Sequence, residues 1–210
     1  MYPGYIILVF LGIIIYMGLA QRALDRLHLT DNQALILIAF ILIGSFFNLT
    51  LSKDPLITVN IGGALVPFLL AIYVFSRADS TKEVLRTSIA IILTAVTIYL
   101  ISYYLRSYGE GRDYFDPLYI YAITGGITAY IVGRSRRSAF IAGILGYLLY
   151  DMVNLWKLLS GKILTQIRFG AAGAFDTIVI SGLTAVLLAE LIGESRERIK
   201  YGKEDDKNEK

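Results

Sequence analysis

The sequence predicts an all-α fold, a polytopic transmembrane helix bundle of about seven spans with its N-terminus out and its C-terminus in. Three observations predict it. Hydrophobic residues make up 56% of the 210 residues, and the mean hydropathy of +0.61 is too high for a soluble domain of this size. The apolar residues gather in runs long enough to cross about 30 Å of hydrocarbon. Basic residues are concentrated in the connections between these runs and in the tail.

Seven apolar runs can be marked along the chain. They are Tyr5–Ala20, Gln33–Leu51, Leu56–Ser76, Thr87–Tyr104, Leu118–Val132, Ser138–Leu155 and Gly170–Leu191. Since a helix rises about 1.5 Å per residue, each run reaches or nearly reaches across a bilayer. No basic residue precedes the first run, so we expect a retained span and no cleaved signal peptide.

The basic residues predict the orientation. With an outward N-terminus, the inside connections and the tail carry 14 Lys and Arg residues, and the outside connections carry six. The positive-inside rule therefore favours a multi-pass protein of the cell membrane with its C-terminus inside. Two domains follow: a transmembrane helical domain over residues 1–193, and a charged cytoplasmic tail over 194–210, which we expect to be disordered.

Composition excludes several kinds of chemistry. The chain has no cysteine, so disulfides, iron–sulfur clusters and thiol catalysis are excluded. Its single histidine, His28, lies in a polar connection, which argues against a catalytic triad and a histidine metal site. We therefore expect no metal and no cofactor. The pI of about 9.0 comes from residues that flank apolar runs, so the expected partner is the lipid bilayer and not nucleic acid.

Two aspartates interrupt the last two apolar runs. An ionisable side chain in hydrocarbon is costly and is a functional hypothesis by default, which makes Asp151 and Asp176 the candidate site residues. Asp151 lies about 20 Å along a helix that starts at Ser138, and Asp176 lies about 9 Å along one that starts at Gly170. Because the two helices run in opposite directions, both carboxylates are expected at one depth in the outward half of the membrane.

Other polar and small residues are expected near the same level. Asn48 and Asn60 reach it from the second and third runs, and Asn154 shares the helical face of Asp151. These residues predict a polar cavity supported by closely packed small residues. Beside Tyr147, the expected lining and supporting residues are Tyr150, Asn154, Asn60, Asn48, Gly63, Ala64, Pro67, Gly173 and Thr177. Hydrogen bonding between helices and close packing are the purely structural interpretations of the same residues.

Part of this pattern resembles a known family. Tyr150-Asp151, followed one helix later by Gly173-Ala174-Phe175-Asp176, resembles the Tyr-Asp and Gly-x-Gly-Asp motifs of presenilin and signal peptide peptidase. The resemblance implies an intramembrane aspartyl protease that cleaves membrane-embedded peptides, with Asp151 and Asp176 as its catalytic pair. The chain departs from that pattern at Phe175, which replaces a glycine. In addition, Gly62–Pro67, the nearest analogue of the family's Pro-Ala-Leu segment, precedes the aspartates.

The third, sixth and seventh runs are also similar to a family of uncharacterised bacterial and archaeal membrane proteins, the domain of unknown function 1614, which implies no activity. Two other functions remain open. Intramembrane aspartates with amide oxygens nearby also form the sites of proton- or cation-coupled transporters. A non-catalytic membrane scaffold could use the same aspartates to hold its helices together.

Overall fold

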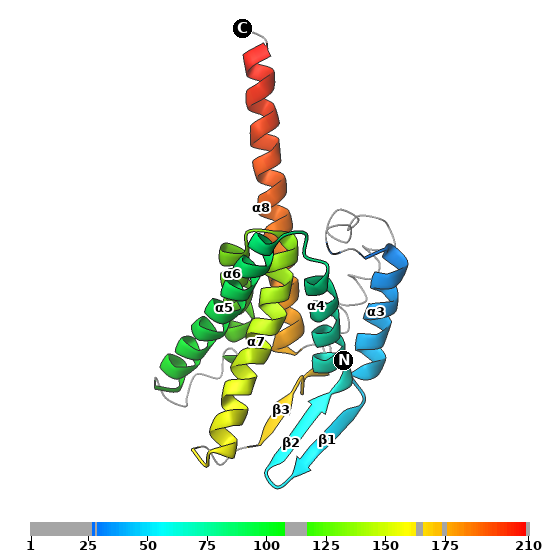
Figure 1. The fold of residues 1–210 in the computed structure, drawn as a ribbon, viewed down its shortest axis with the longest axis vertical. Coiled ribbons are helices and arrows are strands. Elements are labelled where there is room, and N and C mark those ends of the chain that lie inside the picture. Colours follow the sequence, from blue (N-terminus) through cyan, green and yellow to red (C-terminus); the bar gives the residue numbers. More distant parts are fainter. Residues whose placement is uncertain (1–26, 28, 108–116, 163–165, 174–175, 209–210) are drawn as a thin grey trace.

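The computed structural model describes residues 27, 29–107, 117–162, 166–173 and 176–208, with backbone alone at 106–107, 117–118 and 193–208. This part of the chain is mostly helical (Figure 1). Its elements include the short π-helix η1 (Ile61–Leu65) and the α-helices α3 (Asp31–Gly44), α4 (Val66–Ser76), α5 (Thr81–Ser107), α6 (Pro117–Gly133), α7 (Arg136–Leu159) and α8 (Thr177–Asn208). The first predicted run, Tyr5–Ala20, lies outside the described residues. The number of spans and their orientation stay predictions.

The helix α7 lies at the centre of the bundle and packs against α4, α5, α6 and α8. Its first turn is capped by Ser135, whose hydroxyl accepts a hydrogen bond from the backbone N–H of Ser138 at 3.1 Å. Small residues bring its neighbours close. A Cβ added to Gly143 would lie 2.9 Å from the carbonyl oxygen of Ser181 on α8, and one added to Gly146 would lie 2.7 Å from Cβ of Thr94 on α5.

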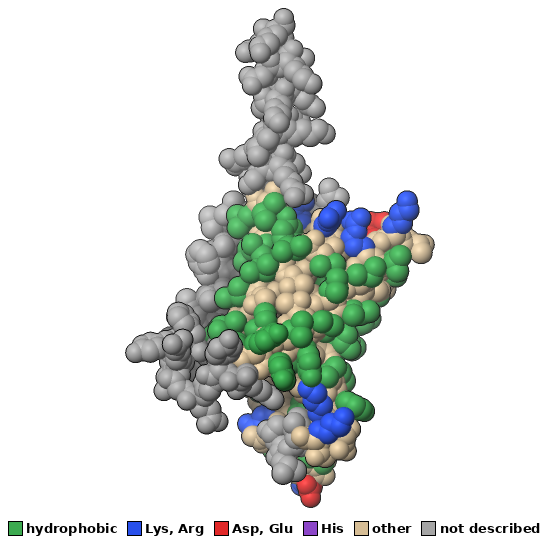
Figure 2. All heavy atoms as spheres, turned by 90° about the vertical axis from the view of Figure 1, so that its left-hand side faces the viewer, with side chains coloured by type: hydrophobic (Ala, Val, Ile, Leu, Met, Phe, Trp, Pro, Cys, Tyr) green, Lys and Arg blue, Asp and Glu red, His purple; other side chains and the backbone are tan. Residues whose placement is uncertain are grey.

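Two of the described helices are long and apolar enough to cross a membrane, Thr81–Leu105 within α5 and Arg136–Leu159. In the most apolar stretch of α5 only 28% of the residues are buried, against 56% in α7. The outer face of α5 is therefore apolar and uncovered. Figure 2 shows hydrophobic side chains across the middle of this side of the molecule, with Lys and Arg side chains above and below them.

A three-stranded sheet lies at one end of the bundle, in the order β1 (Asn48–Lys53), β2 (Leu56–Asn60) and β3 (Ile167–Phe169) (Figure 1). The pair β1 and β2 is antiparallel with Asn48 opposite Asn60, and β2 and β3 are parallel with Val59 opposite Phe169. The expectation of unbroken helices over Gln33–Leu51 and Leu56–Ser76 is therefore wrong. Asparagine, threonine and serine alternate with apolar residues there, which is the strand period of two.

The fourth, fifth and sixth predicted runs are helical, in α5, α6 and α7. The seventh is helical only from Thr177, because Gly170 and Gly173 adopt left-handed φ values of +69° and +62° and form a turn. Beyond the bundle, α8 continues as helical backbone through 194–208, where we expected disorder (Figure 1). The division of the chain into two domains stays a prediction.

Four glycines and Ser45 form a seam between the first and last parts of the chain, which we call the glycine seam: Gly62, Gly63, Gly170 and Gly173 with Ser45. A Cβ on Gly63 would lie 2.3 Å from the carbonyl oxygen of Gly170, and a Cβ on Gly62 would lie 2.5 Å from the backbone nitrogen of Ser45. Real Cβ atoms do not approach backbone so closely. The turn after β3 therefore packs directly on the backbone of η1.

Two glycines with the same backbone conformation test the glycine seam. Gly170 has φ +69° and a Cβ there would meet the nitrogen of Ala64 at 2.5 Å, whereas Gly161 has φ +68° and nothing within 4 Å. Gly161→Ala should cost about 1–2 kcal/mol of unfolding free energy for the left-handed φ alone. Gly170→Ala should cost about 1–3 kcal/mol more, because backbone must move. Denaturation in detergent measures both, and equal losses would contradict the seam.

Candidate functional site

The two aspartates of the predicted pair lie on α7 and at the start of α8, two helices separated in the chain by β3. Asp151 is half-buried on α7, and Asp176, 8% exposed, lies in the turn immediately before α8. The two carboxylates are close enough for their charges to interact. The structure therefore brings together the side chains that the sequence analysis singled out, although Asp176 precedes a helix and does not lie inside one.

Asp176 has a structural role of its own. Its carboxylate accepts hydrogen bonds from the backbone N–H groups of Ile178 at 3.1 Å and Ala172 at 3.3 Å. Its own N–H donates to the carbonyl of Gly173 at 3.0 Å, which closes the turn. Asp176 thus caps α8, where unpaired N–H groups and the helix dipole both stabilise a negative charge. An aspartate after a glycine-rich turn is a recognisable signal for a helix start, which the hydropathy pattern concealed.

Two buried tyrosines on α7 surround the pair. Tyr147 lies close to Thr177 and within electrostatic reach of both aspartates. The Tyr147 ring packs edge-on against Tyr150 with centroids 5.6 Å apart, and Tyr150 packs at 6.4 Å against Tyr121 of α6. The residue that joins the two halves of the site is therefore Tyr147, whereas Tyr150 of the Tyr-Asp motif contributes to packing.

The asparagines do not form one cavity with the aspartates. Asn60 is buried and uses its side chain completely: its amide donates to Asn48 Oδ1 at 3.0 Å and to the carbonyl of Ser45 at 2.9 Å, and its Oδ1 accepts from the N–H of Gly63 at 2.8 Å. Asn60 therefore caps η1, and Asn48 is an exposed strand residue. No hydrogen bond among the described residues joins either asparagine to a carboxylate. Asn154 is half-buried on α7, one turn after Asp151.

The small residues expected to support the site are buried. Ala64 and Pro67 lie at the packed start of α4, and Gly63 and Gly173 belong to the glycine seam. This arrangement connects the cap of η1 to the cap of α8 through backbone contacts. Close packing accounts for these residues without a ligand.

An apolar groove of about 400 Å³ lies along α7, lined by neighbours of Asp151 in the helix but not by Asp151 itself. Its walls come from the sheet, α4, α5 and α7, and include Leu51, Val59, Phe68, Leu148, Met152 and Leu155. Leu148 precedes Asp151 by three positions and Leu155 follows it by four, so both lie beside it on the surface of α7. All the lining residues are apolar. The groove therefore suits an apolar chain.

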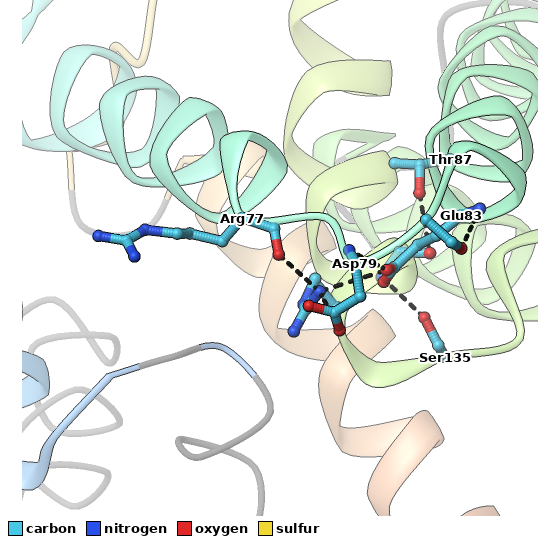
Figure 3. Close-up of polar contacts among 8 residues, drawn as sticks. Arg77, Asp79, Glu83, Thr87 and Ser135 are labelled. Atoms are coloured by element: carbon cyan, nitrogen blue, oxygen red, sulfur yellow. Dashed lines mark hydrogen bonds and ion pairs between the residues drawn. The ribbon is translucent and has the colours of Figure 1, made fainter.

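A buried arginine organises the opposite end of the bundle (Figure 3). Arg137 Nη1 donates to the carbonyl of Arg77 at 2.9 Å, to Asp79 at 3.0 Å and to Glu83 at 3.2 Å. It ties the connection between α4 and α5 to the start of α7. Beside it, Arg136 forms an ion pair with Glu190 of α8. In the sequence these arginines indicate only the orientation of the chain, whereas Asp79 and Glu83, two acids in a basic connection, indicate an ion pair there.

These features define a mostly helical, strongly apolar protein with two helices capable of crossing a membrane and two neighbouring acids near one end, one buried and one half-buried. The family model described as "Protein of unknown function (DUF1614)" matches residues 10–188, and the chain belongs to this family. No curated protein and no solved structure matches the chain. The family similarity noted in the sequence is confirmed; the likeness to presenilin rests on the two short motifs alone.

Substitutions at Asp176 separate its capping role from other roles. Asp176→Ala removes both acceptors and should lower the unfolding free energy by about 1–2 kcal/mol. Asp176→Asn retains an acceptor oxygen and should lower the unfolding free energy by only a few tenths of a kcal/mol. Thermal denaturation in detergent measures the difference. If the alanine variant is as stable as the unmodified protein, the cap contributes nothing.

Arg137 should be critical for stability because its removal leaves carboxylates and a carbonyl without their donor. Arg137→Met should cost about 1–3 kcal/mol, because the charge-assisted hydrogen bonds of the buried guanidinium are lost while Asp79, 75% exposed, is solvated by water once unpaired. Arg86→Met is the matched control, since Arg86 is exposed on the neighbouring turn of α5 and should change stability by less than about 0.5 kcal/mol. Similar melting temperatures for the two variants would contradict the structural role of Arg137.

Proposed function

We propose that this protein is a multi-pass protein of the cell membrane that cleaves membrane-embedded peptides, with Asp151 and Asp176 as its catalytic pair. The observation that carries the proposal is that the two carboxylates, on α7 and at the start of α8, lie near enough for their charges to interact. Tyr147 of α7 and Thr177 of α8 lie close together beside them.

The membrane environment is supported by the surface of α5. Its apolar side chains are uncovered, among them Leu85, Ile92, Leu93, Val96 and Leu100. Exposed apolar surface of this extent on a monomer indicates contact with lipid or with another protein. The basic residues at the ends of the band in Figure 2 correspond to the charged flanks of membrane spans.

The two aspartates have different surroundings, which suits different tasks. Two backbone N–H groups stabilise Asp176 as an anion, whereas Asp151 accepts no hydrogen bond from the described residues. Two carboxylates at close quarters favour holding one proton between them. Asp176 then takes a proton from a water whose oxygen bonds to the peptide carbonyl carbon, and Asp151 gives its proton to the carbonyl oxygen. A carboxylate has about four acceptor positions, so capping leaves Asp176 able to act.

The apolar groove supports a peptide substrate. It is lined by apolar residues alone, among them Leu148 and Leu155 on either side of Asp151 along α7, so it would take the side chains of a membrane-embedded segment and no charged solute. A segment placed there would lie along the part of α7 that carries Asp151. The substrate class that this geometry favours is therefore an apolar peptide.

Replacement of either aspartate should abolish cleavage while the fold survives. In liposomes with a single-span peptide, Asp151→Asn and Asp176→Asn should each reduce cleavage by about 100-fold or more, as expected for loss of a general acid or base. Mass spectrometry of the peptide measures the products. Asp79→Asn, a carboxylate at the other end of the bundle, is the matched control. Undiminished cleavage by either variant of the pair would refute the proposal.

A second candidate, proton- or cation-coupled transport, is favoured by one observation. The helical segment of η1 and α4 begins directly after β2, and α8 begins after β3 and a turn, so both helices start next to extended backbone. Helices next to extended backbone form the ion sites of many transporters. No three His, Cys, Asp or Glu side chains gather in the described ranges, so a cation at the pair would need amide or carbonyl oxygens as well. Under this function the same two variants lose ion-driven uptake into liposomes and no peptide is cut. If neither assay changes, the aspartates are structural and the protein is a scaffold.

A further inference from the structure

A second groove lies between α5 and α6, at the end of the bundle that carries the Arg137 cluster. It has a volume of about 620 Å³. Three cationic side chains line it, those of Lys82, Arg86 and Arg134. Its remaining walls are apolar and include Leu85, Ile89 and Ile131. The groove is therefore cationic in one part and apolar in the rest.

The three cations are available for a ligand. All three are exposed, and none forms an ion pair with another described residue, whereas the adjacent Arg136 and Arg137 are both paired. The acid that faces this region, Glu83, is engaged by Arg137 at 3.2 Å. Because Arg137 is shared between Glu83 and Asp79, one negative charge remains beside the groove. The three cations outnumber it, so the groove keeps a net positive charge within the described part of the protein.

A smaller polar cavity of about 180 Å³ adjoins the groove and shares Lys82 and Arg86 with it. Its other walls carry the hydroxyl groups of Ser80, Ser135 and Ser138 and the carboxylate of Glu83. Cations and hydroxyl groups together are the partners that a phosphate group uses. The phosphate of a ligand is therefore expected where the groove and the polar cavity meet.

Arg134 has a backbone conformation that argues for a role of its side chain. Its φ of 56° lies in the left-handed region, which residues other than glycine adopt only at a cost in free energy. The turn itself needs only the backbone, because the N–H of Arg134 donates to the carbonyl of Tyr130 at 2.9 Å and ends α6. Glycine is the usual residue at such a helix end. An arginine here is unfavourable for the turn but adds a third cation to the groove.

We propose that the groove between α5 and α6 binds an anionic phospholipid, with its phosphate at Lys82, Arg86 and Arg134 and an acyl chain along Leu85, Ile89 and Ile131. The apolar wall continues into the uncovered band of α5 and α6, so the chain extends into the bilayer (Figure 2). The groove lies at the end where basic residues predict the cytoplasmic leaflet, in which anionic lipids bind basic clusters. This inference depends on the membrane placement and not on the aspartate pair.

Native mass spectrometry of the full chain in detergent tests the proposal, with phosphatidylglycerol and phosphatidylcholine as probes. Phosphatidylglycerol should bind preferentially, and Lys82→Gln, Arg86→Gln and Arg134→Gly should each weaken it about fivefold. Arg134→Gly should also keep or raise the melting temperature, so that its loss of binding cannot reflect unfolding. Arg168→Gln, an exposed arginine at the sheet end, should leave binding unchanged.

Three outcomes overturn the proposal. They are equal binding of the two lipids, undiminished phosphatidylglycerol binding in all three groove variants, and displacement of phosphatidylglycerol by inorganic phosphate at equal concentration. The last result would show a phosphate site without a contribution from the apolar wall. Cleavage and transport assays have no part in this test, so its failure would leave the proposed role of the aspartates standing, and failure of cleavage or transport would leave the lipid site standing.

Discussion

The contact of Gly63 with the carbonyls of Gly170 and Gly173 is the constraint on which the rest of the structure depends. Only a hydrogen fits in the place of a side chain at this contact, so the segment from β2 into η1 and the turn before α8 must lie backbone against backbone. The parallel pairing of β2 with β3 and the burial of Asp176 both follow from this approach. Segments more than 100 residues apart in the sequence are thereby fixed to one another.

The same constraint gives Asp176 two roles. Its carboxylate closes the turn that carries the glycines and neutralises the free N–H groups of α8, so part of its cost of burial is offset by hydrogen bonds. Asp151 has no comparable support among the described residues, and its half-buried position on an apolar helix is harder to explain by stability alone. The functional interpretation therefore depends more on Asp151 than on Asp176. Capping of α8 explains an aspartate at position 176 even without a catalytic role.

Sequence reasoning predicted the helices α5, α6 and α7 because their apolar runs are uninterrupted. It failed where strands are as apolar as helices: hydropathy does not distinguish Asn48–Lys53 from the end of a span, whereas the alternation of polar and apolar residues does. The order of the apolar runs put Asp151 and Asp176 on successive runs, and the helical rise per residue put both carboxylates at one depth in the membrane. Depth could not show that Asn60 faces Ser45 and Asn48, or that Arg137 reaches Asp79, because both contacts depend on which helix faces which.

The length of α8 gives the molecule a mechanical property. Its 32 residues correspond to a rod of about 48 Å. The rod is anchored at its buried end by the Asp176 turn and again, near the point where it leaves the bundle, by Arg136 and Glu190; beyond that point it stands clear of the other helices (Figure 1). If the Asp176 end of this helix shifts while the Arg136–Glu190 ion pair holds, α8 tilts about the ion pair. A displacement of the Asp176 carboxylate would therefore move the far end of α8 as well.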